Sequence, residues 1–217
     1  MSSIKLTADS NGGTFEVKAP SSSSNTRVLT LPDTANGTML TTTNPASGNV
    51  VQTAQTLVSS TSSLVINAAN TNFPITVLDT TITSKYANSK FIFSGQIFAE
   101  SNNEDHDLAF NLGRVIGGTE TYFARGDADG QRARITRNMA VGFRDSDNSS
   151  TPSQTIFGSI IDSPAQAAGT AITYRLNVFA TGGTPSWNFY INRALDDTND
   201  LHIERGVSYI LIQEVAP

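Results

Sequence analysis

The chain has 217 residues, of which 38% are hydrophobic and 15% charged, and its formal net charge is -5 at pH 7. This length allows one large all-β domain or a smaller domain with an appendage, and the acidic balance gives the whole chain no electrostatic reason to bind nucleic acid. Cysteine is absent, which excludes disulfides, thiolate metal sites and cysteine nucleophiles.

The first 43 residues predict a segment of short strands. No basic leader followed by an apolar run is present, so we expect a protein made in a cytosol without a secretion signal, and no apolar run is long enough to insert into a membrane. Alternating residues at 14–17 and 27–31 favour strands, with Asn-Gly and Pro-Asp turn signals around them. The segment has too few large apolar side chains to offset about 1–2 kcal/mol of backbone entropy per ordered residue. Residues 1–43 should therefore need a partner surface.

Residues 44–84 carry one charged side chain, Asp79, and are otherwise rich in Ser, Thr, Asn and small aliphatic residues. Such a composition suits a flexible linker. However, residues 57–58, 64–66 and 73–78 are apolar and largely β-branched, which favours strands. We expect extended stalk strands here, lying on a neighbouring chain or on the domain that follows.

Residues 85–217 predict a β-rich head domain. Runs with strand character recur at intervals of roughly 10 to 20 residues, with Gly, Pro, Asn and Asp between them. The runs are 90–99, 107–116, 121–125, 134–143, 155–162, 171–180, 187–193 and 207–215, and 75–83 adds one more before them. No segment shows helical periodicity. The fold class is therefore all-β, an antiparallel jelly roll or β-sandwich.

The cations of the head are unusual. All four lysines precede residue 91, and all nine basic residues after it are arginines. Because arginine suits buried ion pairs and interfaces, the pattern favours subunit contacts, with lineage bias as the alternative. Arg132, Arg134 and Arg137 are the candidate contacts between subunits, and an anion site for acidic surface sugars is the competing interpretation.

Several stretches occur in an order that resembles phage tail and head fibres with a trimeric jelly-roll tip like those of tumour necrosis factor and C1q. The N-terminal ones are TFEVKAP (14–20), NTRVLTLPD (25–33) and NGTMLTT (36–42). The later ones are SKFIFSGQIF (89–98), DHDLAFNLGR (105–114), FARGDADGQRAR (123–134), IIDSP (160–164), TYRLNVFATGG (173–183), FYINR (189–193) and RGVSYILIQEV (205–215).

This resemblance implies a homotrimeric virion protein, made in the host cytoplasm and carried on a phage particle. Residues 1–43 would attach it to a tail, baseplate or capsid protein and begin the intertwining of three chains. The jelly-roll head would bind a glycan or protein on the host surface. The alternative is a capsid-decorating head fibre or cement protein without an obligatory receptor. A full tail fibre is normally much longer than this chain, so a short fibre, a distal tip or a capsid spike is expected.

Two polar loops of the head are candidates for host contact. One spans 145–154 and includes Asp147 and Asn148, and the other spans 181–186. Trp187 follows the second loop, where its ring would stack on a sugar or anchor the core.

Catalytic and metal-binding signatures are weak, so we expect no enzyme and no cofactor. His106 and His202 are the only histidines, and no G-x-S-x-G motif is present. Residues 104–107 (EDHD) offer metal-ligand types, but a strand would point them to opposite faces, which leaves a solvated turn or a metal shared by three subunits. Residues 127–130 (DADG) lack the remaining positions of a calcium loop. A polysaccharide-degrading spike would need paired carboxylates, with Glu100 beside the 104–105 pair as the best available set.

Overall fold

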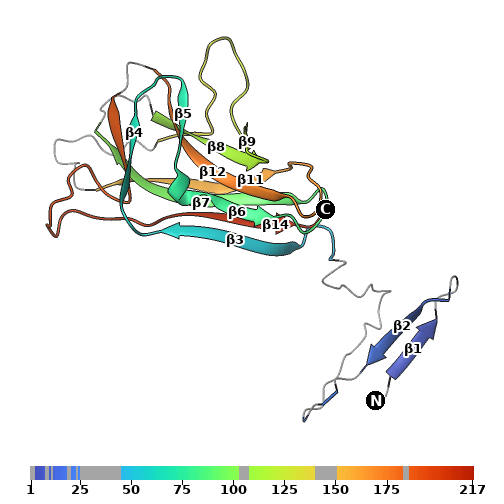
Figure 1. Cartoon of the computed structure of the whole chain (residues 1–217). Coiled ribbons are helices and arrows are strands. Elements are labelled where there is room, and N and C mark those ends of the chain that lie inside the picture. Colours follow the sequence, from blue (N-terminus) through green and yellow to red (C-terminus); the bar gives the residue numbers. More distant parts are fainter. Residues whose placement is uncertain are drawn as a thin grey trace. The chain divides into compact units, whose positions relative to one another are not determined.

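The computed structural model describes residues 3–7, 10, 12–18, 21, 22, 24, 45–102, 108–139, 151–182 and 186–217. The chain divides into two compact units, Met1–Met39 and Leu40–Pro217 (Figure 1). Within the described residues there is no α-helix, and no helix that could span a membrane.

The smaller unit contains an antiparallel hairpin of β1 (Ser3–Thr7) and β2 (Thr14–Lys18). Its register places Ile4 opposite Val17 and Leu6 opposite Phe15, so these four positions share one face. The side chains of Ile4, Leu6 and Val17 are exposed. The strand expected at 14–17 is confirmed, whereas the one expected at 27–31 lies outside the described residues.

The larger unit is a sandwich of two antiparallel sheets. Its strands are β3 (Val50–Val58), β4 (Ser62–Ile66), β5 (Thr71–Pro74), β6 (Thr80–Thr83), β7 (Lys90–Ser101), β8 (Leu108–Ile116), β9 (Thr119–Phe123), β10 (Arg137–Asn138), β11 (Ser153–Asp162), β12 (Ala171–Ala180), β13 (Trp187–Ile191) and β14 (Ser208–Val215). A 3-10 turn, η1 (Thr76–Leu78), precedes β6. The all-β antiparallel fold expected from the sequence is confirmed.

Each sheet has six strands. In the first, called the β7 sheet, β11 lies along one edge of β7, and β14 and β13 follow one another along the other edge, with β3 and β4 outside them. In the second, called the β12 sheet, β12 pairs with β8 on one side and with β5 and β6 on the other. β9 and β10 both pair with the outer edge of β8.

The core lies between the two sheets because the strands alternate in burial. Along β7 every second side chain is buried, and β12 alternates in the same way over most of its length. Aromatic rings from both sheets meet there, with Phe93 and Phe110 each in edge-on contact with Phe157 of β11. Such contacts add specific geometry to the hydrophobic burial that holds the sheets together.

Of the two expectations for residues 44–84, the structure shows the second, since their strands lie on the domain that follows. They are part of its sandwich, so the separate stalk is corrected. β3 pairs with β14, β4 with β13, and both β5 and β6 with β12. The head therefore begins near residue 45 and not at residue 85. The low charge of this stretch has a physical reason, since its strands cover the sheet edges and contribute buried side chains such as Ile66 and Leu78.

Two expected strands are shorter in the structure. The run 75–83 begins with η1, so only Thr80–Thr83 forms a strand. The run 134–143 keeps a two-residue strand, β10, and its last four residues lie outside the described part.

The larger unit has two unlike ends. The chain enters beside its own C-terminus, where Gly48 N–H donates to Ala216 O at 3.0 Å and Ala216 N–H donates to Asn49 O at 2.9 Å. We call this the proximal end. At the opposite, distal end lie the end of β7, the starts of β8 and β11, and the β13–β14 loop (Figure 1).

Candidate functional surfaces

The outer face of the β7 sheet lacks charge over its centre. Cross-strand pairing places the outward-facing residues side by side. They are Ile92, Ser94 and Gln96 of β7, Tyr209, Leu211 and Gln213 of β14, Thr53, Gln55 and Leu57 of β3, and Gln154, Ile156 and Ile161 of β11. Leu57, Ile156 and Ile161 are 60%, 51% and 64% exposed.

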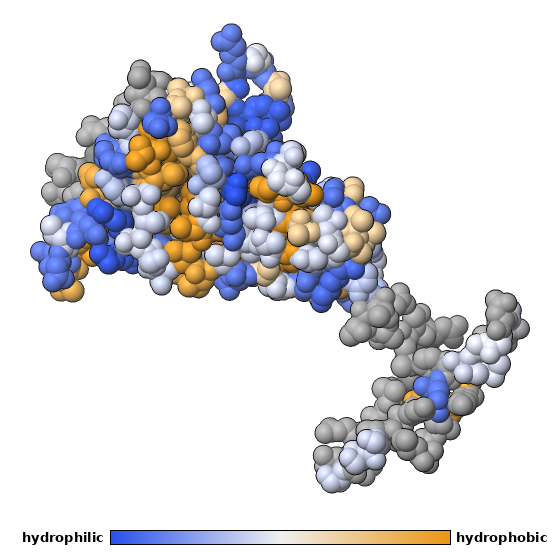
Figure 2. Space-filling view, in the orientation of Figure 1, coloured by the Kyte–Doolittle hydropathy of each residue, from blue (hydrophilic) through white to orange (hydrophobic). Residues whose placement is uncertain are grey.

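Hydrogen bonds of glutamine side chains link residues of this uncharged face. Gln154 Nε2 donates to Gln96 Oε1 at 3.1 Å, and Gln96 Nε2 donates to Val207 O at 2.9 Å. Figure 2 shows that hydrophobic residues also gather in patches on the visible side of the larger unit. A surface that is apolar and uncharged at its centre is typical of a protein interface.

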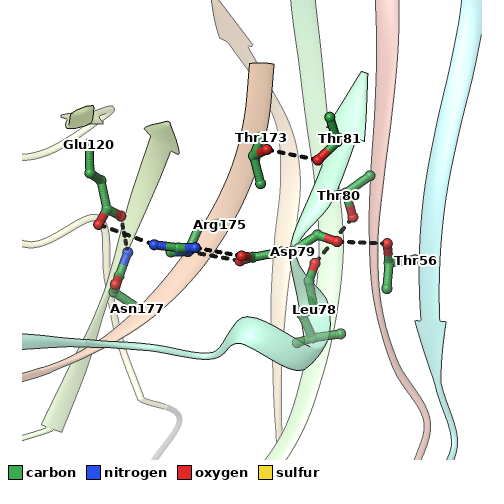
Figure 3. A network of polar contacts seen from close by, with 9 residues as sticks. All are labelled: Thr56, Leu78, Asp79, Thr80, Thr81, Glu120, Thr173, Arg175 and Asn177. Carbon is green, nitrogen blue, oxygen red and sulfur yellow. Dashed lines mark hydrogen bonds and ion pairs between the residues drawn. The ribbon is translucent and has the colours of Figure 1, made fainter. Parts of the chain in front are cut away.

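The outer face of the β12 sheet carries a row of paired polar groups (Figure 3). Arg175 binds Asp79 through two hydrogen bonds of 2.9 and 2.5 Å, and its other terminal nitrogen lies 3.7 Å from Glu120. Asn177 Nδ2 donates to Glu120 Oε1 at 2.8 Å. A Cβ at Gly113, beneath this row, would meet the Glu120 carboxylate, so a larger residue there would displace the end of that side chain.

This row crosses the β12 sheet from one edge to the other. Asp79 follows η1, Arg175 lies in β12, and Glu120 lies in β9. The hydrogen bonds to Asp79 are the main cause that raises the pKa of Arg175, although partial burial opposes it. The charged groups of this face are therefore paired with one another, whereas the centre of the outer face of the β7 sheet carries no charged side chain.

A loop that we call the finger, residues 124–138, leaves the edge of the β12 sheet. β9 pairs with residues 112–116 of β8 and β10 pairs with 109–110, so residues 124–136 form an excursion between two strands that share one edge (Figure 1, yellow-green). Its base is closed by Gly126 N–H donating to Ile135 O at 3.1 Å and by Arg134 Nε donating to Gly126 O at 2.7 Å. The Arg125 guanidinium lies 4.9 Å from the centre of the Tyr122 ring.

The β13–β14 loop, residues 192–207, projects at the distal end (Figure 1, red). Asn192 anchors it, with Nδ2 donating to Val58 O at 2.8 Å and to Ser60 O at 3.0 Å. Farther out, Asp197 pairs with Arg205 at 2.9 Å and with Arg193 at 3.7 Å.

Two buried carboxylates stabilise the proximal half. Asp162 of β11 pairs with Arg114 and accepts a hydrogen bond from the Tyr174 hydroxyl at 2.9 Å, which ties the β7 sheet to the β12 sheet. Burial raises the pKa of Asp162 and that of Tyr174. Glu214 of β14 accepts hydrogen bonds from the loop that follows β6.

The candidates chosen from sequence fall in different places. Trp187 is half-buried at the start of β13, opposite Ile66, and packs against the core, which was the alternative to sugar stacking. Arg132, Arg134 and Arg137 are exposed and lie together on the finger, where Arg132 pairs with Asp129. Residues 127–130 lie at the exposed tip of the finger.

Other candidates lie outside the described residues. These are Asp147, Asn148 and the 104–107 stretch that includes His106. His202 is exposed in the β13–β14 loop, and its backbone N–H donates to Asp200 Oδ1 at 3.0 Å. In the part of the chain that the structure describes, no group of three or more His, Cys, Asp or Glu could hold a metal ion.

Sequence reasoning missed the uncharged face of the β7 sheet. The signal was present in KFIFSGQIFAE, where the residues between the buried Phe and Ile positions are Ile92, Ser94 and Gln96. A strand that faces solvent ordinarily carries charged residues at such positions. Once the alternation of buried and outward-facing residues is assigned, the lack of charge there identifies the uncharged face.

No family model matches the chain. No curated protein matches it. Among solved structures, it is similar to the VP2 subviral particle protein of infectious bursal disease virus, with 12% identity, a TM-score of 0.37, and coverage of 94% of this chain and 47% of that one. A second is the protein of the Gx strain of the same virus, with 14% identity, a TM-score of 0.35, and coverage of 94% and 46%. The chain spans less than half the length of these proteins.

Proposed function

We propose that this chain is a non-enzymatic structural protein of a phage particle that assembles as a homotrimer and attaches to the host surface. The observation that carries the proposal is the uncharged outer face of the β7 sheet. A copy in isolation would leave this face in water, with Leu57, Ile156 and Ile161 more than half exposed. Association of copies through this face removes that apolar area from water without the free-energy cost of desolvating charged groups.

The outer faces of the two sheets indicate which surfaces of the subunits meet. The β12 sheet has a polar outer face whose charges are already paired, as expected for a surface that remains in solvent. The β7 sheet has the composition of the buried centre of an interface. The subunits would therefore meet through the β7 sheets and expose the β12 sheets.

The two ends of the sandwich are suited to different roles, attachment at the proximal end and host binding at the distal end. The chain enters at the proximal end, so the N-terminal attachment segment is joined there. The β13–β14 loop lies at the distal end, where a loop held on a rigid sandwich is suited to bind a host glycan or protein. Several weak sites in a multimeric fibre would raise avidity without new contacts.

The hairpin supports attachment to another virion protein. Two strands alone are marginally stable in water, and Ile4, Leu6 and Val17 lie exposed on one of its faces. A partner surface, supplied by other copies or by a tail, baseplate or capsid protein, would cover this face.

The test is the mass of the full chain in solution, measured by light scattering. We expect three times 23.1 kDa. Ile156→Asp, which places a charge on the uncharged face, should give monomers at the same concentration, because the carboxylate would have to be desolvated.

Val77→Asp is the matched control, since Val77 is an apolar side chain of η1, 44% exposed, that is not among the outward-facing residues of the uncharged face. It should leave the trimer intact. A monomeric full chain would contradict the homotrimer and would favour a capsid-decorating protein whose copies are organised by the shell.

A further inference from the structure

The arginines of the larger unit form two groups. Every described arginine outside the finger pairs with a carboxylate. These pairs are Arg114 with Asp162, Arg175 with Asp79, and both Arg193 and Arg205 with Asp197. Within the finger, Arg132 pairs with Asp129, but Arg125, Arg134 and Arg137 contact no carboxylate among the described residues.

The carboxylates of the β13–β14 loop complement these arginines. Asp196, Asp200 and Glu204 form no ion pair with any described residue. Asp196 and Asp200 accept hydrogen bonds from the backbone N–H groups of Thr198 and His202, and Glu204 accepts one from the Thr151 hydroxyl. Three carboxylates on this loop thus match three arginines on the finger, and among the described residues neither set has a partner of opposite charge.

The two loops also lie at corresponding heights along the sandwich. β10 pairs with Phe110 and Ala109, near the distal end of β8. The β13–β14 loop ends where β14 begins, at Ser208, which is also distal. In a closed ring of identical copies whose axis follows the strands, surfaces at equal height on neighbouring copies face each other.

We propose that the finger of one copy binds the β13–β14 loop of the next copy through ion pairs of Arg134 and Arg137 with Asp196, Asp200 or Glu204. This inference rests on the homo-oligomer proposed above and names a second pair of surfaces in it. The finger forms no core of its own, and its tip residues 127–134 are all exposed. A loop of this length is ordered most readily when its polar groups form hydrogen bonds or ion pairs. The planar guanidinium group of arginine can bind both oxygens of a carboxylate. Such charge pairs set the register between subunits and speed their encounter.

The test uses the full chain and measures the concentration at which half of the oligomer has dissociated. Arg137→Glu is the primary variant, because Arg137 is exposed on β10 and forms no ion pair with any described residue. It should raise the dissociation midpoint by about tenfold or more, since like charges facing each other across an interface are costly. The matched control is Lys85→Glu, which changes the net charge equally at the proximal end, where Lys85 Nζ donates to Val51 O. The control should leave the midpoint within about twofold.

The decisive variant combines reversals in one chain. Arg137→Glu together with Asp200→Arg and Glu204→Arg restores opposite charges between position 137 and positions 200 and 204, whereas Arg137→Glu alone, or the two loop reversals alone, places like charges together. Arg134 is kept because its Nε closes the base of the finger, and it can pair with the unchanged Asp196. The combined variant should recover the oligomer. Raising NaCl from about 50 mM to about 500 mM should weaken the original chain, because exposed ion pairs are screened.

The outcomes separate this inference from the proposed function. A monomeric original chain overturns both. If Arg137→Glu raises the dissociation midpoint no more than Lys85→Glu does, the homotrimer stands and the contact between finger and loop is overturned. The same conclusion follows if the combined variant does not recover the oligomer. If Arg137→Glu instead abolishes binding of a sulfated polysaccharide such as heparin and leaves the oligomer unchanged, the finger binds acidic glycans, and the inference is also overturned.

Discussion

Glu214 shows how one residue fixes the proximal end of the head. Its carboxylate is fully buried and accepts hydrogen bonds from the backbone N–H of Lys85 at 2.8 Å, the backbone N–H of Tyr86 at 3.1 Å and the Ser89 hydroxyl at 2.7 Å, and also from Gln52. Burial acts to raise the pKa of Glu214, but these hydrogen bonds outweigh it and hold the pKa below its ordinary value. The charged form is therefore the one that the folded state stabilises.

The lowered pKa gives stability a defined pH dependence. A carboxylate whose folded pKa lies below its unfolded pKa contributes stability above the unfolded value, and this is lost as the pH falls through the folded one. Glu214→Gln replaces an acceptor by an NH2 group that would face the N–H donors, so it should cost about 2–4 kcal/mol at pH 7.

Urea unfolding at matched protein concentration, followed from pH 7 down to about pH 3, measures both effects. The variant should show a shallower loss of stability in acid than the original chain. Asp127→Asn, at an exposed position on the finger, is the control and should unfold like the original. Equal acid sensitivity of the original chain and Glu214→Gln would contradict this role of Glu214.

At the scale of the element, the pairing of β7 with β14 depends on Gly95. A Cβ at this position would lie 2.6 Å from the backbone oxygen of Tyr209, and neither backbone can move without disturbing the register on both sides. Gly95→Ala should therefore lower the free energy of unfolding by about 1–3 kcal/mol.

Gly158→Ala provides the comparison, since a Cβ there meets nothing within 4 Å and β11 already shifts register at that point. Thermal unfolding of the two variants in parallel measures the difference. A Gly95→Ala protein as stable as Gly158→Ala would show that the two strands lie farther apart than described.

The elements also show what the sequence can and cannot predict. Local alternation is sufficient for β12, whose bounds of Ala171–Ala180 agree with the sequence expectation. It fails for residues 44–84, because pairing with strands at least 88 residues later, the separation of Thr83 from Ala171, decides that these residues belong to the head. The same limit applies to the Asp79–Arg175 pair, which joins residues 96 positions apart, since no local pattern encodes such a partner.

For the whole molecule, the position of the head boundary predicts how truncations behave. A chain beginning at Pro45 keeps all twelve strands of the sandwich and should fold, whereas a chain beginning at Lys85 lacks β3, β4, β5 and β6. The second truncation removes Ile66, Ile75, Leu78 and Ile82 from the core. Burial of four such side chains is worth about 6–12 kcal/mol, which is comparable to the entire stability of a typical domain, about 5–15 kcal/mol.

The loss extends beyond the core, because the Lys85 truncation also leaves the edges of β12, β13 and β14 open to pairing with other chains. We expect cooperative thermal unfolding for the Pro45 chain and aggregation for the Lys85 chain, measured by calorimetry and light scattering on the same preparations. A folded, monodisperse Lys85 chain would place the boundary back at residue 85 and return residues 44–84 to the stalk. If the Pro45 chain keeps the mass of a trimer, the larger unit is sufficient for assembly and the hairpin is not needed for it.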